Sequence, residues 1–315
     1  YPYRLSFPNA KVDDASEDAL LQKALGAKQS AEVAKLNPQS ANLNFSKVNY
    51  SQMAPHVNLD PRQGLEDAPS FELYRSRIPM TIFRGITADI NKMFFHYGPM
   101  PAHGNEVTRS RFLSPIFNCL VPLFGLHIRT TPEVQLEGSK GRYKKAVGNA
   151  TEHLNAVAQL IAGCNAGDFA NQRTYLQVPV YGILYDGNAF EFFMFSRNTE
   201  SPSQPSFFCG LLEDPTGSKD IMPLALLTGK SRTFVSFASF DLLLKSYIKC
   251  LTQYYNISQE DSNPGLKRPS LDGWDAAIKS AKEALDICRQ ADQHHAAGEW
   301  EASNAKAEHG MQMLR

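Results

Sequence analysis

The sequence lacks any excess of charge, because its 315 residues include 32 lysines plus arginines and 32 aspartates plus glutamates. This balance gives no global sign of a nucleic-acid or membrane partner, although a locally basic patch is compatible with it. Long apolar runs are missing too. Residues 112–126 form one of the longest, and proline and polar residues break it well short of the roughly 20 residues of a membrane-spanning helix. We therefore expect no membrane-spanning helix.

Cysteine patterns that hold metals or form redox sites are also absent. Reduced, buried thiols are the ordinary outcome for cysteines that occur singly in apolar or helical contexts, so we favour them over disulfides and metal ligands. The five cysteines are Cys119, Cys164, Cys209, Cys250 and Cys288. Dispersed histidines disfavour a zinc site, and neither a Walker loop nor a Gly-x-Ser-x-Gly elbow occurs. We predict an intracellular protein, nuclear or cytoplasmic, including the case of delivery into a host cell.

The apolar pattern divides the chain into three regions. Residues 1–69 are predicted to be a helical N-terminal region with an extended connector, and we expect no core in residues 38–69. Residues 70–258 are predicted to form an α/β domain with a small mixed central sheet flanked by helices, and residues 259–315 a helical hairpin. Within the α/β domain we expect helices over residues 70–78, 87–97, 105–120, 144–166 and 239–255, and strands over residues 126–136, 175–185, 189–195, 207–212 and 234–237.

The C-terminal hairpin has a clear apolar face, formed by Trp274, Ile278, Ala281, Leu285 and Cys288. It resembles a tetratricopeptide hairpin, but only one copy is visible, whereas solenoids need about three repeats for stability. We favour a hairpin that packs on the main domain over a peptide-binding groove. A protein partner that binds through this hairpin stays as an alternative.

A few polar residues stand out by position between residues 105 and 195. Glu106 lies in the first turn of a predicted helix, where an acid is favoured by the helix dipole whether or not a metal is near. Gln159 lies on an otherwise apolar stripe, where its amide needs a partner. The densest basic cluster of the chain is Lys140, Arg142, Lys144 and Lys145. These side chains suit phosphate contacts, and a solvated loop explains them equally well. The aromatic run 190–195 is interpreted as core.

The order of these segments resembles that of the PD-(D/E)XK nuclease-like superfamily. Within it, the chain is most similar to fungal Crinkler-type effector nucleases. About ninety residues carry the resemblance, above all the helix with Gln159 and the Tyr-Gly-Ile-Leu-Tyr-Asp-Gly segment at 181–187. The resemblance implies a restriction-endonuclease-like fold, Mg2+ or Mn2+ as cofactor and DNA as substrate. It also implies Glu106, Lys144 and Gln159 as catalytic residues, with Lys144 or Lys145 as the active-site lysine.

The sequence departs from that superfamily at the acidic motif. Where a strand with Asp and a Glu/Asp-x-Lys strand are expected, the chain reads only Gly-Arg-Tyr-Lys-Lys-Ala at 141–146. Either the site is degenerate, or a hairpin is missing between Tyr143 and Lys144. Glu133 and Glu137 are the local carboxylates that could substitute, and we assign Glu137 with Glu106 as metal ligands. Lys140 lies one residue too far from Glu137 for the usual spacing, which on a strand moves it to the other face.

Three functions follow from these patterns. The preferred one is a metal-dependent nuclease acting on DNA, with Lys140, Arg142 and Lys145 as nucleic-acid contacts. It fits an effector or genome-conflict protein of a eukaryotic microbe. The alternative is a non-catalytic interaction module that retains the nuclease fold. A third is an accessory portion of a longer protein.

Overall fold

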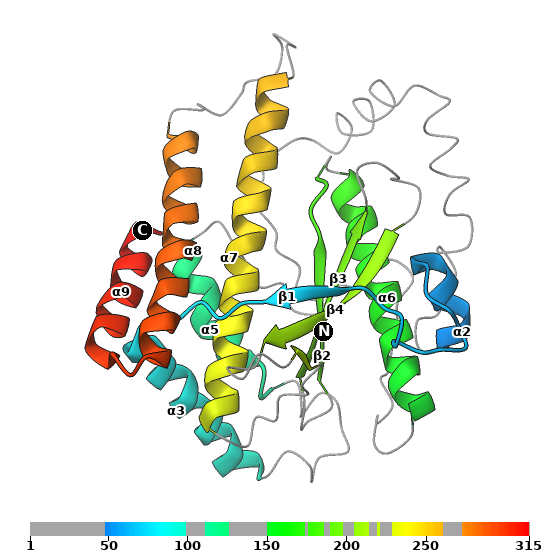
Figure 1. Ribbon diagram of the computed structural model, residues 1–315, viewed down its shortest axis with the longest axis horizontal. Coiled ribbons are helices and arrows are strands. Elements are labelled where there is room, and N and C mark those ends of the chain that lie inside the picture. Colours follow the sequence, from blue (N-terminus) through cyan, green and yellow to red (C-terminus); the bar gives the residue numbers. More distant parts are fainter. Residues whose placement is uncertain are drawn as a thin grey trace.

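The computed structural model describes residues 48–98, 111–125, 150–173, 176–185, 190–197, 205–213, 219–220, 229–260 and 273–314. Its centre is a small mixed sheet with the strand order β1-β4-β3-β2 (Figure 1). The strands are β1 (Ser70–Leu73), β2 (Val180–Tyr185), β3 (Phe190–Arg197) and β4 (Pro205–Glu213), and the short β5 (Lys219–Asp220) pairs with the end of β4. β2, β3 and β4 are antiparallel neighbours, whereas β1 runs parallel to β4. The protein is therefore of the mixed α/β class.

Helices cover both faces of the sheet. The helical elements are α2 (Tyr50–Met53), η3 (Ala54–Val57), α3 (Met80–Tyr97), α5 (Ser114–Leu120), η5 (Val121–Phe124), α6 (Ala150–Arg173), α7 (Gly229–Glu260), α8 (Trp274–Ala296) and α9 (Trp300–Met313). Side chains alternate between the two faces along a strand. In β3, Phe190 and Phe192 therefore belong to one hydrophobic cluster, and Phe193 and Phe195 to the other. All four rings are buried, so the aromatic run is core, as predicted.

One face, here called the α6 face, carries Phe193, Phe195 and Phe207 and is covered by α6, α2 and η3. α6 brings Val157, Ala158 and Ile161 to this cluster at helical spacing. Close approach depends on Gly182 of β2, because a Cβ there would lie 2.8 Å from Cδ1 of Leu160. Glycine at this position therefore allows α6 to lie directly on the strand.

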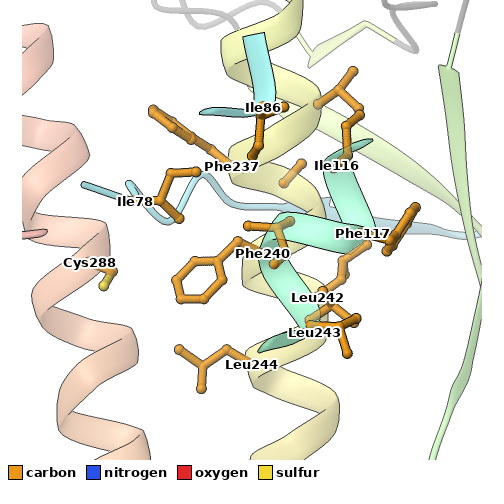
Figure 2. Close-up of a cluster of buried hydrophobic side chains, with 14 of the residues drawn as sticks. Ile78, Ile86, Ile116, Phe117, Phe237, Phe240, Leu242, Leu243, Leu244 and Cys288 are labelled. Carbon is orange, nitrogen blue, oxygen red and sulfur yellow. The ribbon is translucent and has the colours of Figure 1, made fainter. Parts of the chain in front are cut away.

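The opposite face, here called the α7 face, carries Phe190 and Phe192 and is covered by α7, α3 and α5. Figure 2 shows its centre, where Phe237 and Phe240 of α7 lie near Ile86 and Ile116 of the two other helices. α8 and α9 join this cluster through residues such as Cys288 and Met311. They form the C-terminal helical hairpin that the sequence predicts, and it packs on α7.

The hairpin itself closes around a glycine. A Cβ at position 310 of α9 would lie 2.5 Å from Sγ of Cys288 and 3.3 Å from the carbonyl oxygen of Ala284. Ser303 of α9 donates a hydrogen bond of 2.7 Å to the carbonyl oxygen of Ala291. Small residues and one buried hydroxyl thus let the two helices approach closely.

Several predicted elements match the structure. The hairpin predicted around Asp186 is the antiparallel pair β2–β3, with Tyr185 opposite Phe190. The predicted helix 144–166 corresponds to α6, the helix 87–97 to the end of α3, and the strand 207–212 to β4. The helix 239–255 lies within α7. Local periodicity was a sufficient signal for these segments.

Three predictions are wrong. Residues 70–73 form strand β1 and residues 74–79 have no regular secondary structure, so the helix 70–78 does not form. Residues 234–237 belong to α7 and not to a strand. The prediction failed because a short apolar run does not distinguish a buried strand from a buried helix. Residues 38–69 do contribute to a core, since Tyr50, Met53 and Val57 are buried against α6.

Other predictions fall wholly or partly outside the described residues. The helix 105–120 is described only from residue 111, and its regular part is α5, which begins at Ser114. The strand 126–136 and the turn 186–189 lie outside the described residues. The boundaries at residues 69 and 258 stay predictions. Among the described residues, no helix is long and apolar enough to cross a membrane.

Candidate functional site

The predicted catalytic segment lies largely outside the described residues. This applies to Glu106, Glu137 and the whole basic cluster of Lys140, Arg142, Lys144 and Lys145. Gln159 is the predicted site residue that the structure describes, and it lies half-buried in the middle of α6. Gln159 is thus the one predicted site residue within the described part of the chain, and its position relative to the others stays a prediction.

The neighbourhood of Gln159 is the contact between α6 and β2. The next residue along the helix, Leu160, packs on Gly182. About two helical turns later, a Cβ at Gly167 would lie 3.4 Å from a side-chain carbon of Val180. Gly182 belongs to the Tyr-Gly-Ile-Leu-Tyr segment, and Gln159 to the helix, on which the nuclease resemblance rests. The two segments that carry that resemblance are thus in direct contact.

Two pairs of polar side chains link α6 to β3 on both sides of Gln159. Toward the beginning of α6, Nε2 of His153 lies 2.9 Å from a carboxylate oxygen of Glu191. Toward its end, Nε of Arg197 donates to the carboxylate of Asp168 at 2.6 Å. Glu191, Phe193 and Arg197 have the same parity on β3, so all three point to the α6 face. These pairs fix α6 across β3 and leave Gln159 between them.

A second charged centre lies at the α7 face, around the carboxylate of Asp241. This side chain is 1% exposed, and Lys245 of α7 and Arg289 of α8 pair with it at 3.0 and 2.8 Å. Oγ of Ser76 donates a third hydrogen bond of 2.6 Å. A buried carboxylate is stable only with such partners. Since these partners come from α7, α8 and the residues after β1, Asp241 joins the three segments.

The residues after β1, numbers 74–79 and here called the strap, contact α7 and α8 at successive positions. The ring of Tyr74 lies under Lys245 and Arg289, with the cation 4.4 and 4.1 Å from the ring centroid. A hydrogen bond from Tyr74 to the Glu72 carboxylate raises the pKa of this phenol. Burial lowers the pKa of Lys245, which Asp241 opposes. The strap therefore contributes an aromatic ring that contacts both cations of the charged centre.

The strap continues with two arginines. Arg75 forms an ion pair of 2.9 Å with Asp292. Arg77 is buried, its guanidinium lies 5.6 Å from the ring centroid of Phe237, and its amide donates to the carbonyl of Cys288 at 2.9 Å. Its Nε and Nη1 have no hydrogen-bond partner among the described residues. Burial lowers the pKa of Arg77.

The chemistry available to the described residues is that of structural contacts. Both oxygens of Asp241 are engaged, so this carboxylate has no free lone pair directed at a substrate. All five cysteines are free, and burial raises the pKa of Cys164, Cys250 and Cys288 to about 12. These thiols are protonated at neutral pH and are therefore poor nucleophiles. Within the described ranges, no group of three or more His, Cys, Asp or Glu is placed to hold a metal.

Sequence reasoning missed both the pairs between α6 and β3 and a second centre, the charged one at Asp241. The available signal for the second one was Asp241 itself, a lone acid inside the apolar run Phe-Ala-Ser-Phe-Asp-Leu-Leu-Leu, because a buried acid requires partners. Its partners could not be inferred, since they come from elsewhere in the chain. His153 lies far in sequence from its partner Glu191, so no local pattern pointed to this pair.

Comparison of the chain with protein-family models, with curated proteins and with solved structures finds no match.

Proposed function

We propose that the protein is a nuclease-like α/β protein that acts on DNA with a divalent metal. The observation that supports this proposal is the contact between α6 and β2, where Leu160, next to Gln159, packs on Gly182. The glutamine helix and the Tyr-Gly-Ile-Leu-Tyr strand resemble two neighbouring parts of the PD-(D/E)XK superfamily. Their direct packing supports the proposal of a restriction-endonuclease-like arrangement.

In this proposal the carboxylates of Glu106 and Glu137 hold the metal, because oxygen ligands suit Mg2+ and Mn2+. A bound divalent ion would polarise the scissile phosphate and lower the pKa of the attacking water. Lys144 stabilises charge at the phosphate, and Gln159 orients the site through its amide. Lys140, Arg142 and Lys145 contact the DNA backbone. We propose an intracellular site of action, nuclear or cytoplasmic.

The test is cleavage of plasmid and single-stranded DNA by the full chain with Mg2+ or Mn2+. Loss of cutting in Glu106→Ala and Lys144→Ala, and a smaller loss in Gln159→Ala, would support the proposal. Glu152→Ala is the matched control for Glu106→Ala, because Glu152 is an exposed acid in the first turn of α6. The absence of metal-dependent cutting by folded protein, or an equal loss in the Glu152 control, would overturn it.

A non-catalytic interaction module is the second candidate function. The observation in its favour is the α8–α9 hairpin, which the charged centre at Asp241 fixes to the α7 face. Trp300 at the start of α9 is 59% exposed, and exposed tryptophans are enriched at protein interfaces. A folded chain that cuts no DNA, alone or with either metal, would favour this function over the first.

A further inference from the structure

One side of α3 presents exposed aromatic rings at its end and cations along its length. Here we define the α3 patch as Arg84, Lys92, Phe95, Tyr97, Arg111 and Arg232. Phe95 is 88% exposed, the most exposed of the large hydrophobic side chains among the described residues. Phe94 turns inward and its ring lies 5.1 Å from that of Phe112, so the neighbouring Phe95 is directed outward. This ring is not explained by the core.

The spacing along α3 places cations on the same side as Phe95. Phe95 follows Arg84 by about three helical turns, so both side chains leave the helix in nearly the same direction. Lys92, one turn before Phe95, is also exposed, and its ammonium lies 2.8 Å from a carboxylate oxygen of Asp89. The rings of Phe95, His96 and Tyr97 then follow one another, with centroids 5.8 and 6.5 Å apart.

A second segment adds Arg111 to the patch. Its Nη1 donates to the hydroxyl of Tyr97 at 2.7 Å, and its guanidinium lies 5.2 Å from the centroid of that ring. An arginine carries five N–H donors in a fixed plane. One donor orients the guanidinium on Tyr97, and an exposed side chain can direct others at an anion. Tyr97 thus holds this cation at the end of α3.

A third segment adds Arg232 from the first turn of α7. Its Nη1 donates to Oδ1 of Asn91 at 2.6 Å, and its guanidinium lies 5.3 Å from the centroid of Phe94. Partial burial lowers the pKa of Arg232. A partly desolvated cation gains more from a nearby anion than a fully hydrated one does. Figure 1 shows the end of α3 lying beside the beginning of α7, consistent with this contact.

The patch carries four cations, and Asp89 is the acid that an ion pair joins to it. We propose that the α3 patch binds an unpaired strand of nucleic acid, with bases stacked on Phe95 and phosphates held by the cations. This inference rests on the proposed DNA-directed function and names its substrate as single-stranded DNA.

An unpaired strand fits these side chains better than a duplex. In a duplex the base faces are stacked on one another and are hidden from an aromatic side chain, whereas every unpaired base offers a free π-face. The cations alone would suit any nucleic acid, because phosphates are common to all of them. An exposed ring on the same surface as these cations is therefore the feature that favours a single strand over a duplex.

The experiment measures binding of a fluorescein-labelled 20-nucleotide DNA strand to the full chain, by anisotropy in EDTA. Phe95→Ala is expected to raise the Kd about five- to hundredfold, the usual range for loss of base stacking on an aromatic ring. Arg84→Ala and Arg111→Ala are each expected to reduce the slope of log K against log salt by about 0.7. The same DNA annealed as a duplex should bind with an affinity that Phe95→Ala leaves unchanged.

Two matched controls come from other surfaces. Trp300→Ala removes another exposed ring and Arg62→Ala another exposed arginine, and both should leave the Kd and the salt slope unchanged. Equal effects of Phe95→Ala and Trp300→Ala, or equal effects of Phe95→Ala on strand and duplex, would overturn the inference. A preference of more than tenfold for RNA of the same sequence would overturn the assignment of DNA as the strand.

Because EDTA excludes catalysis, failure of this inference is separable from failure of the proposed function. A chain that binds single strands through Phe95 but cuts no DNA retains the binding surface and loses the nuclease proposal. A chain that cuts duplex DNA but shows no Phe95-dependent binding loses the surface alone. Unchanged unfolding midpoints for the variants of the exposed Phe95 and Arg84 would show that the fold is intact.

Discussion

The two faces of the sheet both carry charged side chains, but at different depths. On the α6 face, Asp168 and Arg197 are 7% and 27% exposed, and the pair of His153 and Glu191 is more exposed still. On the α7 face, Asp241 is 1% exposed and has three partners from different segments. On the α6 face, the charged side chains therefore lie toward the two ends of α6 and partly reach solvent. On the α7 face, the central carboxylate lies buried among the packed segments.

This difference predicts how each face responds to the loss of a contact. A charge near solvent that loses its partner becomes hydrated, so its ion pair contributes little to stability. A buried charge that loses its partner remains desolvated, and the loss is large. The α7 face should therefore be the more sensitive of the two to substitution of polar residues.

The largest effect is expected for Asp241→Ala. The substitution leaves the fully buried hydroxyl of Ser76 without its acceptor and removes the partner that Lys245 and Arg289 share, so several contacts are lost at once. We therefore expect a loss of about 3–5 kcal/mol in the free energy of unfolding. Urea unfolding followed by circular dichroism measures it. Asp89→Ala is the control, because this acid pairs on the surface with Lys92. Equal, small effects of the two substitutions would contradict a structural role for the centre.

The second prediction compares a glycine on each face. Gly310→Ala should destabilise the protein by about 1–3 kcal/mol, because the new Cβ meets Sγ of Cys288 and a backbone carbonyl oxygen. Gly182→Ala should cost less, since the three atoms nearest to its Cβ all belong to the side chain of Leu160 and none to the backbone. Thermal unfolding of both variants tests the order. The double variant Gly310→Ala/Cys288→Ala should be less destabilised than the sum of its single variants, and strict additivity would argue against the steric contact.

The sequence predicted the α6 face better than the α7 face, for a physical reason. Its main elements, α6 and the β2–β3 hairpin, are continuous in the chain and show their periods locally. The α7 face depends on β1, which pairs in parallel with β4 far along the chain, and on the strap. Parallel pairing and a strap without regular secondary structure leave no local period, so the sequence of residues 70–78 favoured a short helix.

The candidate sites divide in the same way. Gln159 could be singled out because it interrupts an apolar stripe on one helix. The Asp241 centre could not, because Ser76 and Arg289 lie 165 and 48 residues away in sequence. The α3 patch also combines three segments, and only the adjacent rings of Phe95, His96 and Tyr97 were visible locally. Sites built from distant segments need the fold before they can be recognised.

The third prediction concerns the better-buried pair on the α6 face. Asp168→Asn removes the charge that faces Arg197 and weakens the contact with Gln172, which lies 2.6 Å away. Because Arg197 is partly exposed and can be hydrated, we expect a loss of about 1 kcal/mol, well below that of Asp241→Ala. The same urea measurement compares the two. A loss as large as that of Asp241→Ala would remove the proposed difference between the faces.

The smallest effect is expected at the rim of the α7 face, where His295 lies near Arg75, Arg77 and Asp292. Burial, followed by Arg77, lowers the pKa of His295, and Asp292 opposes this shift. The unfolded state therefore binds more protons at this histidine, and its contribution to stability falls as the pH drops through about 6.5, the ordinary pKa of histidine. His295→Gln should accordingly flatten the fall of the unfolding midpoint between about pH 7 and 5.

The pH profile of His295→Gln must be compared with that of the parent protein, because Asp292 changes the pH dependence of stability in the opposite direction. Burial raises the pKa of this carboxyl, so the folded state binds more protons there and acidification favours folding. The pH profile of the parent protein alone mixes the two groups, whereas the difference between parent and His295→Gln isolates the histidine. His309→Gln, on the exposed side of α9, is the control and should leave the slope unchanged. A slope equally altered by both substitutions would show that general charge, and not the partly buried rim beside the strap, sets the acid sensitivity.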